Sequence, residues 1–315
     1  MQRRYGIIEK FIRMSTKAHQ YKDSDCNVQL LEPVKYMQKC LETRLEYKIP
    51  IAFNVWLKIP VDKFREIALI SKTIHVSTII IDDIQDEAKI RKDVPVAHSI
   101  YGIANSLNAA SHAMLLAVQK VHALNHPQAM EIFLEEILNI HTGQGLEIYW
   151  RDNFTCPSEE SYKAMVLGKT TGLLSFMVRS MQLFSNCKED FTPLINIMGL
   201  YIQICNDYTN FHYDSNTNDE GYADDLSTGS FNFPIMHAIQ THPEDTQIKT
   251  ILKQRTKDIT AKRYCAKLLE KSGSFAYTRN VLEDLDKQAR SEVERLGGNP
   301  LFVEILDNLT DLTIH

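Results

Sequence analysis

The segment FREIALISKTIHVSTIIIDDIQD, residues 64–86, decides the fold class of this chain. Its apolar residues recur at the three- and four-residue steps of a helix, as at Ile67, Ile70, Ile74 and Ile81. The β-branched run VSTIII could by itself form a buried strand, but nothing breaks the helical pattern before it. The pattern therefore predicts one helix of more than about twenty residues that runs into Asp86.

Most of the remaining chain also has helical periodicity. The other expected helices cover about 30–45, 103–124, 127–149, 158–185, 189–214, 232–241, 244–271 and 274–296. Clusters of Pro, Gly, Asn and Asp separate them. The polar segment 215–230 is longer than most loops, and both a functional lid and a solvated loop are open for it.

No repeat or Pro/Ser-rich linker divides the chain, so we expect one all-α domain over residues 29–315. Residues 1–28 are expected to be an N-terminal extension, either a basic helix or disordered. Their basic and apolar pattern is weakly similar to a mitochondrial presequence, against which Glu9 and the scarcity of serine weigh. We expect a cytoplasmic location, with the mitochondrion as the alternative.

Composition excludes several classes of protein. The 315 residues are 44% hydrophobic and 24% charged, with a net charge of −5 whose signs are interspersed, so no footprint for nucleic acid is present. No apolar run approaches the ~20 residues of a membrane-spanning helix. The six cysteines show no paired spacing, which favours a reducing compartment.

The end of the first helix carries a cluster of carboxylates. Asp82 and Asp86 lie four residues apart, on one helix face, with Asp83 beside them. Exposed acids would need no partner, but the apolar stripe leading into Asp82 predicts that these acids point inward and require a cation. Oxygen ligands favour Mg²⁺ first and Mn²⁺ second, and magnesium is commonly shared with substrate phosphates. The cations that follow could bind the same phosphate: Lys89, Arg91 and Lys92.

A second polar stretch, NDYTNFHYD at 206–214, interrupts another apolar helix. Asn206, Asn210 and Asp214 follow Met198 and Ile202 at four-residue steps, so the three acceptors could face one cation. Alone, this spacing is also typical of a solvated helix end. Two such helices in one chain predict a ligand site inside a helical bundle.

Several longer motifs carry a family resemblance. DDIQD and RKDVPVAHSIYG, then GQGLEIYWRD, MVLGKTTGL, QICNDYTN and DDLSTGSFNFPIMHAI, closely resemble animal geranylgeranyl diphosphate synthases over about residues 30–306. The resemblance implies the all-α isoprenoid synthase bundle with a deep central cavity. It also implies condensation of an allylic diphosphate with isopentenyl diphosphate, three Mg²⁺ ions, and a homodimer or higher homo-oligomer.

The resemblance assigns roles to individual residues. Asp82 and Asp86 match the first metal motif, and His75 matches a residue near isopentenyl diphosphate. The residues that match allylic diphosphate contacts are Arg91, Lys169, Thr170 and Gln203, with Lys92 where the family has a second arginine. Pocket depth is expected to depend on the small residues Ser77 and Thr78, and on Ser111–Met114, where relatives carry aromatics. His112 lies in that second group and is more typical of a core or surface histidine than of a catalytic one.

Other positions depart from the family pattern. Thr43 and Glu46 replace the Lys and Arg of the Gly-Lys-x-x-Arg motif that binds isopentenyl diphosphate. Each lost charge-assisted contact costs roughly 1.5–3 kcal/mol. Glu220 and Ser230 replace two lysines that clamp the allylic diphosphate.

The second metal motif also departs from the family. Its leading Asp is Asn206, and the row Asn206, Asn210 and Asp214 is similar to the metal triad of class I terpene synthases. The sequence therefore favours a Mg²⁺-dependent terpene synthase that ionises one allylic prenyl diphosphate of ten to twenty carbons. An ordinary prenyltransferase and an inactive prenyl-diphosphate-binding subunit are the alternatives.

Overall fold

The computed structural model describes residues 29–41, 44–212 and 221–314, and within these the side chains of 44–47, 313 and 314 are left out. The helices are α3 (Glu32–Cys40), α4 (Arg44–Leu57), α5 (Val61–Gln85), α6 (Ala97–Tyr101), α7 (Ile103–Ala123), α8 (Ala129–Asp152), α9 (Glu159–Lys169), α10 (Thr171–Gln182), α11 (Thr192–Thr209), α12 (Asp224–Thr228), α13 (Phe233–Thr241), α14 (Gln247–Lys253), α15 (Ile259–Lys271), α16 (Ser274–Arg295) and α17 (Pro300–Ile314). Two short strands, β1 (Ile90–Arg91) and β2 (Val94–Pro95), form an antiparallel hairpin. The expected all-α fold is confirmed.

Helix α5 is the long helix that its apolar pattern predicted. It begins after Pro60, whose extended backbone sets the entry, and ends where the backbone N–H of Asp86 bonds the carbonyl of Asp82. Its apolar face is fully buried, with Ile67, Ile74 and Ile80 at 0% exposure. The acidic motif therefore lies at the end of a helix whose direction is fixed by the core.

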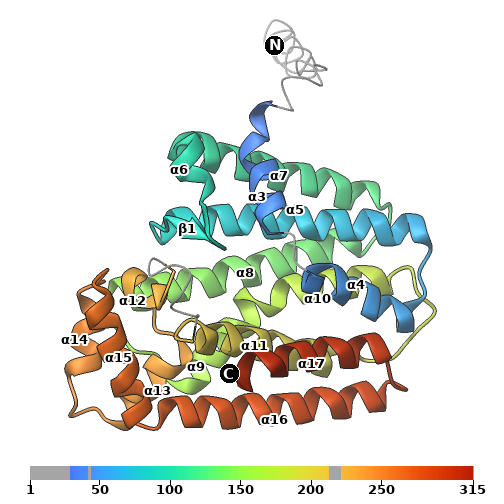
Figure 1. Ribbon diagram of the computed structural model, residues 1–315. Coiled ribbons are helices and arrows are strands. Elements are labelled where there is room, and N and C mark those ends of the chain that lie inside the picture. Colours follow the sequence, from blue (N-terminus) through green and yellow to red (C-terminus); the bar gives the residue numbers. More distant parts are fainter. Residues whose placement is uncertain (1–28, 42–43, 213–220, 315) are drawn as a thin grey trace, which may run out of the picture.

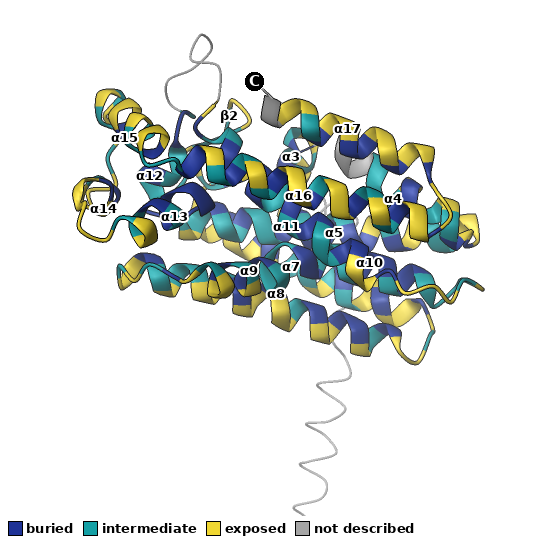
Figure 2. Cartoon of the chain, turned by 90° about the horizontal axis from the view of Figure 1, so that it is seen from below, coloured by how far each residue is buried: buried dark blue, intermediate teal, exposed yellow. Residues whose placement is uncertain are grey.

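The bundle arranges its long helices roughly side by side. In Figure 1, α5, α8, α11 and α16 run in successive rows across the molecule. Helix α5 packs on α7 and α10, while α11 packs on α16, α10, α9 and α17. Figure 2 shows the buried residues concentrated on the inward faces of these helices. The larger apolar cluster joins α4, α5 and α8 to the C-terminal helices, and a smaller, alanine-rich cluster lies between α3, α5 and α7.

Three predicted helix boundaries were wrong. The helix expected over 158–185 divides at Thr170 into α9 and α10, and the one expected over 244–271 divides into α14 and α15. Arg255 in that second break has a left-handed backbone, and Asp258 then caps α15 by accepting from two backbone N–H groups. The helix expected to reach residue 214 ends at Thr209.

Four elements were not predicted at all: α4, α6, α17 and the β1–β2 hairpin. Part of the segment 215–230, expected as a lid or loop, folds into the short helix α12. Among the described residues, no helix is both long enough and apolar enough to cross a bilayer. The expected N-terminal extension, residues 1–28, lies outside the described residues.

Candidate active site

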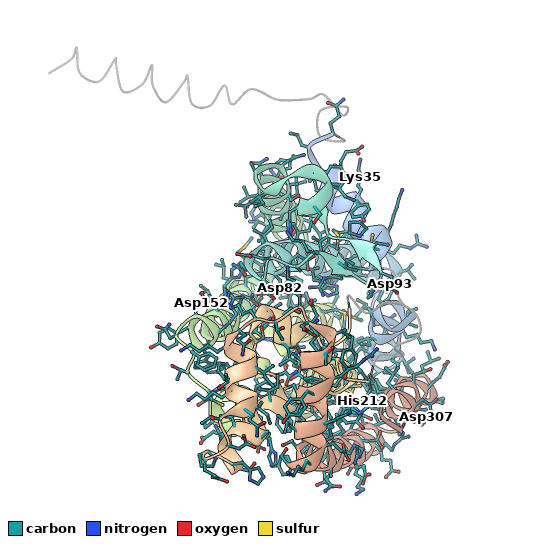
Figure 3. The ribbon with its side chains drawn as sticks, turned by 60° about the vertical axis from the view of Figure 1, so that its left-hand side comes forward. Lys35, Asp82, Asp93, Asp152, His212 and Asp307 are labelled. Atoms are coloured by element: carbon teal, nitrogen blue, oxygen red, sulfur yellow. The ribbon has the colours of Figure 1, made fainter. Side chains whose placement is uncertain are left out.

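Asp82 lies at the centre of a network of donors from three other elements. Its carboxylate accepts from Gln144 Nε2 at 2.9 Å and from Lys169 Nζ at 3.2 Å. A third donor, Arg91, approaches the second oxygen at 3.3 Å. Asp82 points toward the middle of the molecule from the end of α5, as Figure 3 shows. The structure therefore brings Asp82, Arg91 and Lys169 together.

The hairpin after α5 returns Arg91 to the acidic motif. Lys92 and Asp93 have left-handed backbones, with φ of 50° and 63°, as a tight two-residue hairpin turn requires. Arg91 then binds Asp83 through two nitrogens, Nε at 2.8 Å and Nη2 at 2.7 Å. Asp83 is only 1% exposed, and its Oδ2 has no hydrogen-bond partner among the described residues. Lys92 donates to the carbonyl of Leu41 at 3.5 Å.

Asp86 is held by a chain of alternating charges. Arg151 Nη1 contacts its carboxylate at 2.5 Å, and Arg151 Nε contacts Asp152 at 2.9 Å. Asp152 in turn pairs with Arg255 at 3.0 Å. This chain connects the end of α5 to the end of α8 and to the turn between α14 and α15.

One face of α8 supplies the groups that oppose the acidic motif. Gln144, Glu147 and Arg151 recur at helical steps along that face, and Lys169 forms an ion pair with Glu147. The helices α8 and α9 come close because Gly143 lacks a side chain, since a Cβ there would lie 2.5 Å from the backbone nitrogen of Lys169. Gln144, Glu147 and Arg151 belong to the GQGLEIYWRD motif and were not predicted as site residues, although their three- and four-residue spacing indicates a polar stripe.

The network shifts the pKa values of its members in opposite directions. Burial alone would raise the pKa of Asp82, but Lys169 and Arg91 outweigh it and lower that pKa. Burial, Asp82 and Glu147 together raise the pKa of Asp86 to about 7, against the opposing effect of Lys169 and Arg151. Burial opposes the charge of Lys169, but Glu147 and Asp82 raise its pKa overall. At Asp86, burial and the neighbouring acids therefore outweigh the neighbouring cations.

The second polar stretch presents a different carboxylate from those predicted. Asp207, 5% exposed, accepts from the hydroxyl of Tyr162, from Gln203 Nε2 at 2.9 Å and from the backbone N–H of Phe233 at 2.8 Å. Gln203 also accepts from the hydroxyl of Thr170 at 2.8 Å, across the break between α9 and α10. Burial raises the pKa of Asp207 to about 6, against these three donors.

The predicted row of acceptors is not one continuous helix face. Asn206 is exposed, and Asn210 caps the end of α11. The Asn210 side chain accepts from the N–H of Asp225 at 3.5 Å, and its carbonyl accepts from Ala223 at 2.9 Å, so Asn210 holds the start of α12. Asp214 lies outside the described residues.

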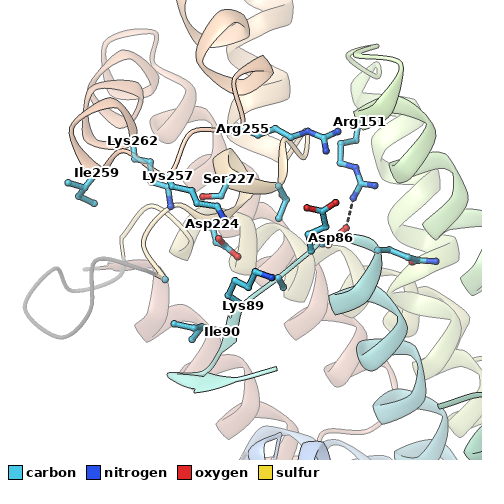
Figure 4. Close-up of a pocket in the computed structure, with 15 residues that line it drawn as sticks. Asp86, Lys89, Ile90, Arg151, Asp224, Ser227, Arg255, Lys257, Ile259 and Lys262 are labelled. Carbon is cyan, nitrogen blue, oxygen red and sulfur yellow. Dashed lines mark hydrogen bonds and ion pairs between the residues drawn. The ribbon is translucent and has the colours of Figure 1, made fainter. Parts of the chain in front are cut away.

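A cleft of about 620 Å³ opens beside Asp86. Figure 4 shows that its wall is built by the end of α5, the hairpin, α12 and the start of α15. The charged residues that line it are Asp86, Glu87, Lys89, Arg151, Asp224, Arg255, Lys257 and Lys262. Asp224 and its neighbour Asp225 were not predicted as site residues, because their segment had no helical pattern.

The residues predicted to set pocket depth lie on α5 and α7, away from the cleft. Ser77 is fully buried and donates to the carbonyl of Thr73 at 2.8 Å, and Thr78 donates to the carbonyl of His75 at 2.9 Å. Burial, with Lys92 and Arg91, lowers the pKa of His75 to about 4. On α7, His112 has a buried Nε2 without a partner among the described residues.

The positions that depart from the family pattern are only partly described. Thr43 and Glu220 lie outside the described residues, and Glu46 lies in α4 without a described side chain. Ser230 is buried and shares a 2.8 Å hydrogen bond with Thr228.

The donor chemistry fits a hard cation. Among the described residues, no three acidic, histidine or cysteine side chains are gathered closely enough to hold a metal as they stand. However, Asp83 keeps a buried oxygen without a described partner, and burial, together with Asp82 and Glu147, raises the pKa of Asp86 to about 7. Mg²⁺ prefers such oxygen ligands, and it would take over part of the role that Arg91, Lys169 and Arg151 have here.

An all-α bundle that gathers acidic helix ends and basic side chains around one cleft is suited to an anionic phosphate ester. A model of the family described as Polyprenyl synthetase matches residues 28–269. The chain belongs to this family and is an enzyme of isoprenoid metabolism, as the resemblance predicted.

The relatives carry two kinds of name. A terpene synthase of Matsumurasca onukii is 48% identical over 91% of this chain and 95% of its own length. A geranylgeranyl pyrophosphate synthase of Mucor circinelloides f. lusitanicus is 41% identical over 89% of this chain and 92% of its own. A geranylgeranyl pyrophosphate synthase of Macrophomina phaseolina is 39% identical over 88% of this chain and 86% of its own length.

Proposed function

We propose that this enzyme is a terpene synthase, which ionises a single allylic prenyl diphosphate of ten to twenty carbons and releases diphosphate. The observation that carries the proposal is the replacement of both basic residues of the isopentenyl diphosphate motif, by Thr43 and Glu46. A carboxylate at the second position repels an anionic substrate. The 48% identity to a chain named terpene synthase supports the same function.

Bound Mg²⁺ would supply positive charge that stabilises the departing diphosphate. The residues that we propose to hold it are Asp82, Asp83, Asp86, Asn206, Asn210 and Asp214. The number of ions is expected to be three, by family resemblance, and Mn²⁺ is the second choice.

The protein's own cations act on the substrate. Arg91 and Lys169, now paired with Asp83, Asp82 and Glu147, become available to the diphosphate oxygens when the acids exchange partners. Thr170 and Gln203, joined by a hydrogen bond, are proposed to contact the same group. These contacts strengthen as charge develops on the leaving oxygen, which is the condition for transition-state stabilisation.

The reaction then follows from the absence of a second substrate. The carbon–oxygen bond breaks with its electron pair going to diphosphate, and the allylic cation lies among the apolar side chains of the bundle. It cyclises, rearranges or loses a proton, and the released diphosphate is a suitable acceptor for that proton. The length of prenyl chain that the enzyme accepts is proposed to depend on Ser77, Thr78 and His112.

A prenyltransferase is the second candidate. The relatives named geranylgeranyl pyrophosphate synthase, at 41% and 39% identity, favour it, and the replacements at 43 and 46 oppose it. An inactive subunit that binds prenyl diphosphates is the third reading.

Product analysis separates these functions. Geranyl, farnesyl and geranylgeranyl diphosphates would each be supplied with Mg²⁺, with and without isopentenyl diphosphate, and the products identified by mass spectrometry. We expect a hydrocarbon from one substrate without isopentenyl diphosphate. Elongation at ordinary rates would overturn the proposal, and no diphosphate release from any substrate would support the inactive subunit.

The variant Thr43→Lys/Glu46→Arg tests directly whether the loss of the isopentenyl diphosphate site prevents coupling. It restores two cations to α4 and its preceding residue, so we expect some coupling of isopentenyl diphosphate to appear. No gain in coupling would mean that other replacements had already closed that site.

A further inference from the structure

The segment that forms α14 and α15 is strongly basic. Residues 247–271 contain eight lysines and arginines against two acids, a formal charge of +6. The whole chain carries −5, so the remainder carries −11. We call residues 247–271 the basic lobe. A charge asymmetry of this size creates a field that acts over distances of about a Debye length, near 10 Å at 0.1 M salt.

The basic lobe reaches the mouth of the cleft. Arg255, Lys257 and Lys262 line the cleft from this lobe, and Lys89 lines it from the loop after α5 (Figure 4). Lys262 is 3% exposed and donates to the carbonyl of Tyr222 at 2.7 Å, so it fixes the lobe to the wall that carries α12. The basic lobe therefore forms part of the cleft wall.

Two of these lysines are available to a ligand. Lys89 and Lys257 are exposed, and neither forms an ion pair with a described residue. Arg255, by contrast, is paired with Asp152 at 3.0 Å, and Lys262 bonds a carbonyl. An anion that approaches the acidic motif through this opening meets Lys89 and Lys257 first.

Basic charge at this opening has a functional role, because the acidic motif behind it repels an anionic substrate. Carboxylates that line the cleft, such as Asp86 and Asp224, repel a diphosphate, and attractive charge at the rim raises the local concentration of this anion. We propose that Lys89 and Lys257 form a capture surface that draws the diphosphate end of the substrate into the cleft before it reaches the acidic motif. The inference rests on the proposed function only in taking a prenyl diphosphate as the substrate.

The test is the association rate constant of geranylgeranyl diphosphate with immobilised protein in the presence of Mg²⁺. We would compare the wild type with Lys89→Gln/Lys257→Gln at low and high ionic strength. Electrostatic steering changes association rates by about 10- to 1000-fold in total, so losing two of several charges is expected to slow association about five- to tenfold at low salt. The dissociation rate changes less, and the difference closes at about 1 M salt, where the Debye length is near 3 Å.

The matched control is Lys267→Gln/Lys271→Gln, which removes the same charge from the basic lobe at exposed positions that do not line the cleft. It is expected to slow association less than twofold. An equal loss in both variants would overturn the capture surface, because the field of the lobe alone would then explain it. So would an unchanged rate in the first variant, or a loss that persists at high salt.

A stronger variant tests the direction of the effect, since Lys257→Glu reverses one charge and should slow association more than the change to Gln. Urea unfolding of each variant verifies that the fold is intact. Failure of the proposed function would appear in the products formed, whereas failure of this inference would appear in the association rate, so the two are distinguishable.

Discussion

The two polar helix ends that face the site are stabilised in opposite ways. At the end of α5, Asp82, Asp83 and Asp86 are held by cations from the hairpin, α9 and α8. At the end of α11, Asp207 is held by a hydroxyl, an amide and a backbone N–H, without an ion pair to a described residue. We call these the ion-paired end and the hydrogen-bonded end.

The difference indicates that the two helix ends have different roles. Ion pairs can be exchanged when new charges arrive, because the partners are long side chains that can turn to another anion. A buried carboxylate with three fixed donors cannot be exchanged without leaving those donors unpaired. The ion-paired end is therefore suited to ligand binding, and the hydrogen-bonded end to positioning α11 against α9 and α13.

The largest expected effect is the loss of activity on changing the ion-paired end. Asp82→Asn keeps the side-chain shape but removes the charge proposed to bind Mg²⁺. We expect product formation to fall by about two to three orders of magnitude, the typical cost of losing one such electrostatic contribution. Steady-state product assays at saturating Mg²⁺ measure it. Asp311→Asn, at an exposed acid on α17, is the control, and a variant at 82 with near-normal activity would refute the metal assignment.

The hydrogen-bonded end is expected to affect stability instead. Tyr162→Phe removes the hydroxyl that donates to Asp207, in a site where both residues are buried. We expect the free energy of unfolding to fall by about 1.5–3 kcal/mol, as for a lost hydrogen bond to a charged group. Urea denaturation measures it, with Tyr149→Phe as the control because Tyr149 is 57% exposed on α8. Equal losses in both variants would contradict the comparison.

The sequence predicted the ion-paired end better than the hydrogen-bonded end. The apolar stripe of α5 is long enough to fix which face is buried, so the inward direction of Asp82 followed from periodicity. At the end of α11, Asn206 and Asp207 are adjacent, and the four-residue steps selected Asn206, whereas Asp207 is the buried side chain. A step pattern cannot tell which neighbour is inside when the helix ends three residues later.

The fold was predictable where the pattern is local. Next to the break at Thr170, α8 approaches α9 closely at Gly143, a contact between helices that periodicity along one helix does not contain. The roles of Glu147 and Arg151 likewise depend on which helix faces α5. The metal ligands, substrate length and expected homodimer stay predictions.

The pH dependence of stability separates the two ends further. Burial raises the pKa of Asp207 to about 6 from the ordinary value of about 4. Between these values the folded chain holds a proton that the unfolded chain has released, so this contribution to stability falls as pH rises and is constant above about 6. Asp207→Asn cannot titrate, so the stability of the wild type relative to the variant should fall by about 2 kcal/mol from pH 4 to pH 7.

Urea unfolding of both proteins across this pH range is the measurement. The titration of Asp86 occurs in both chains and cancels in the difference. A difference that rises with pH would mean that the donors around Asp207 outweigh burial and lower its pKa.

The smallest expected effect is on the Mg²⁺ requirement, through the partner of Asp86. Arg151→Gln removes a cation that contacts Asp86 at 2.5 Å, so the pKa of Asp86, already about 7, should rise further. The variant then needs a higher pH than the wild type to ionise this carboxyl. Loss of Arg151 also removes a cation that competes with Mg²⁺ for Asp86, but this second effect is the same at every pH. The ratio of half-saturating Mg²⁺ concentrations, variant over wild type, should therefore fall a few-fold, roughly two- to fivefold, from pH 7 to pH 8.5.

Mg²⁺ titrations of activity at the two pH values give this ratio. Arg290→Gln is the control, because Arg290 on α16 pairs with Asp286 on the same helix and with Asp307 on α17. For this variant, the ratio of half-saturating Mg²⁺ concentrations should not depend on pH. A constant ratio for Arg151→Gln would mean that Arg151 does not govern the ionisation of Asp86. The pKa of Asp86 would then be set by burial, Asp82, Glu147 and Lys169, and the chain of charges to Arg255 would only hold α8 against the α14–α15 turn.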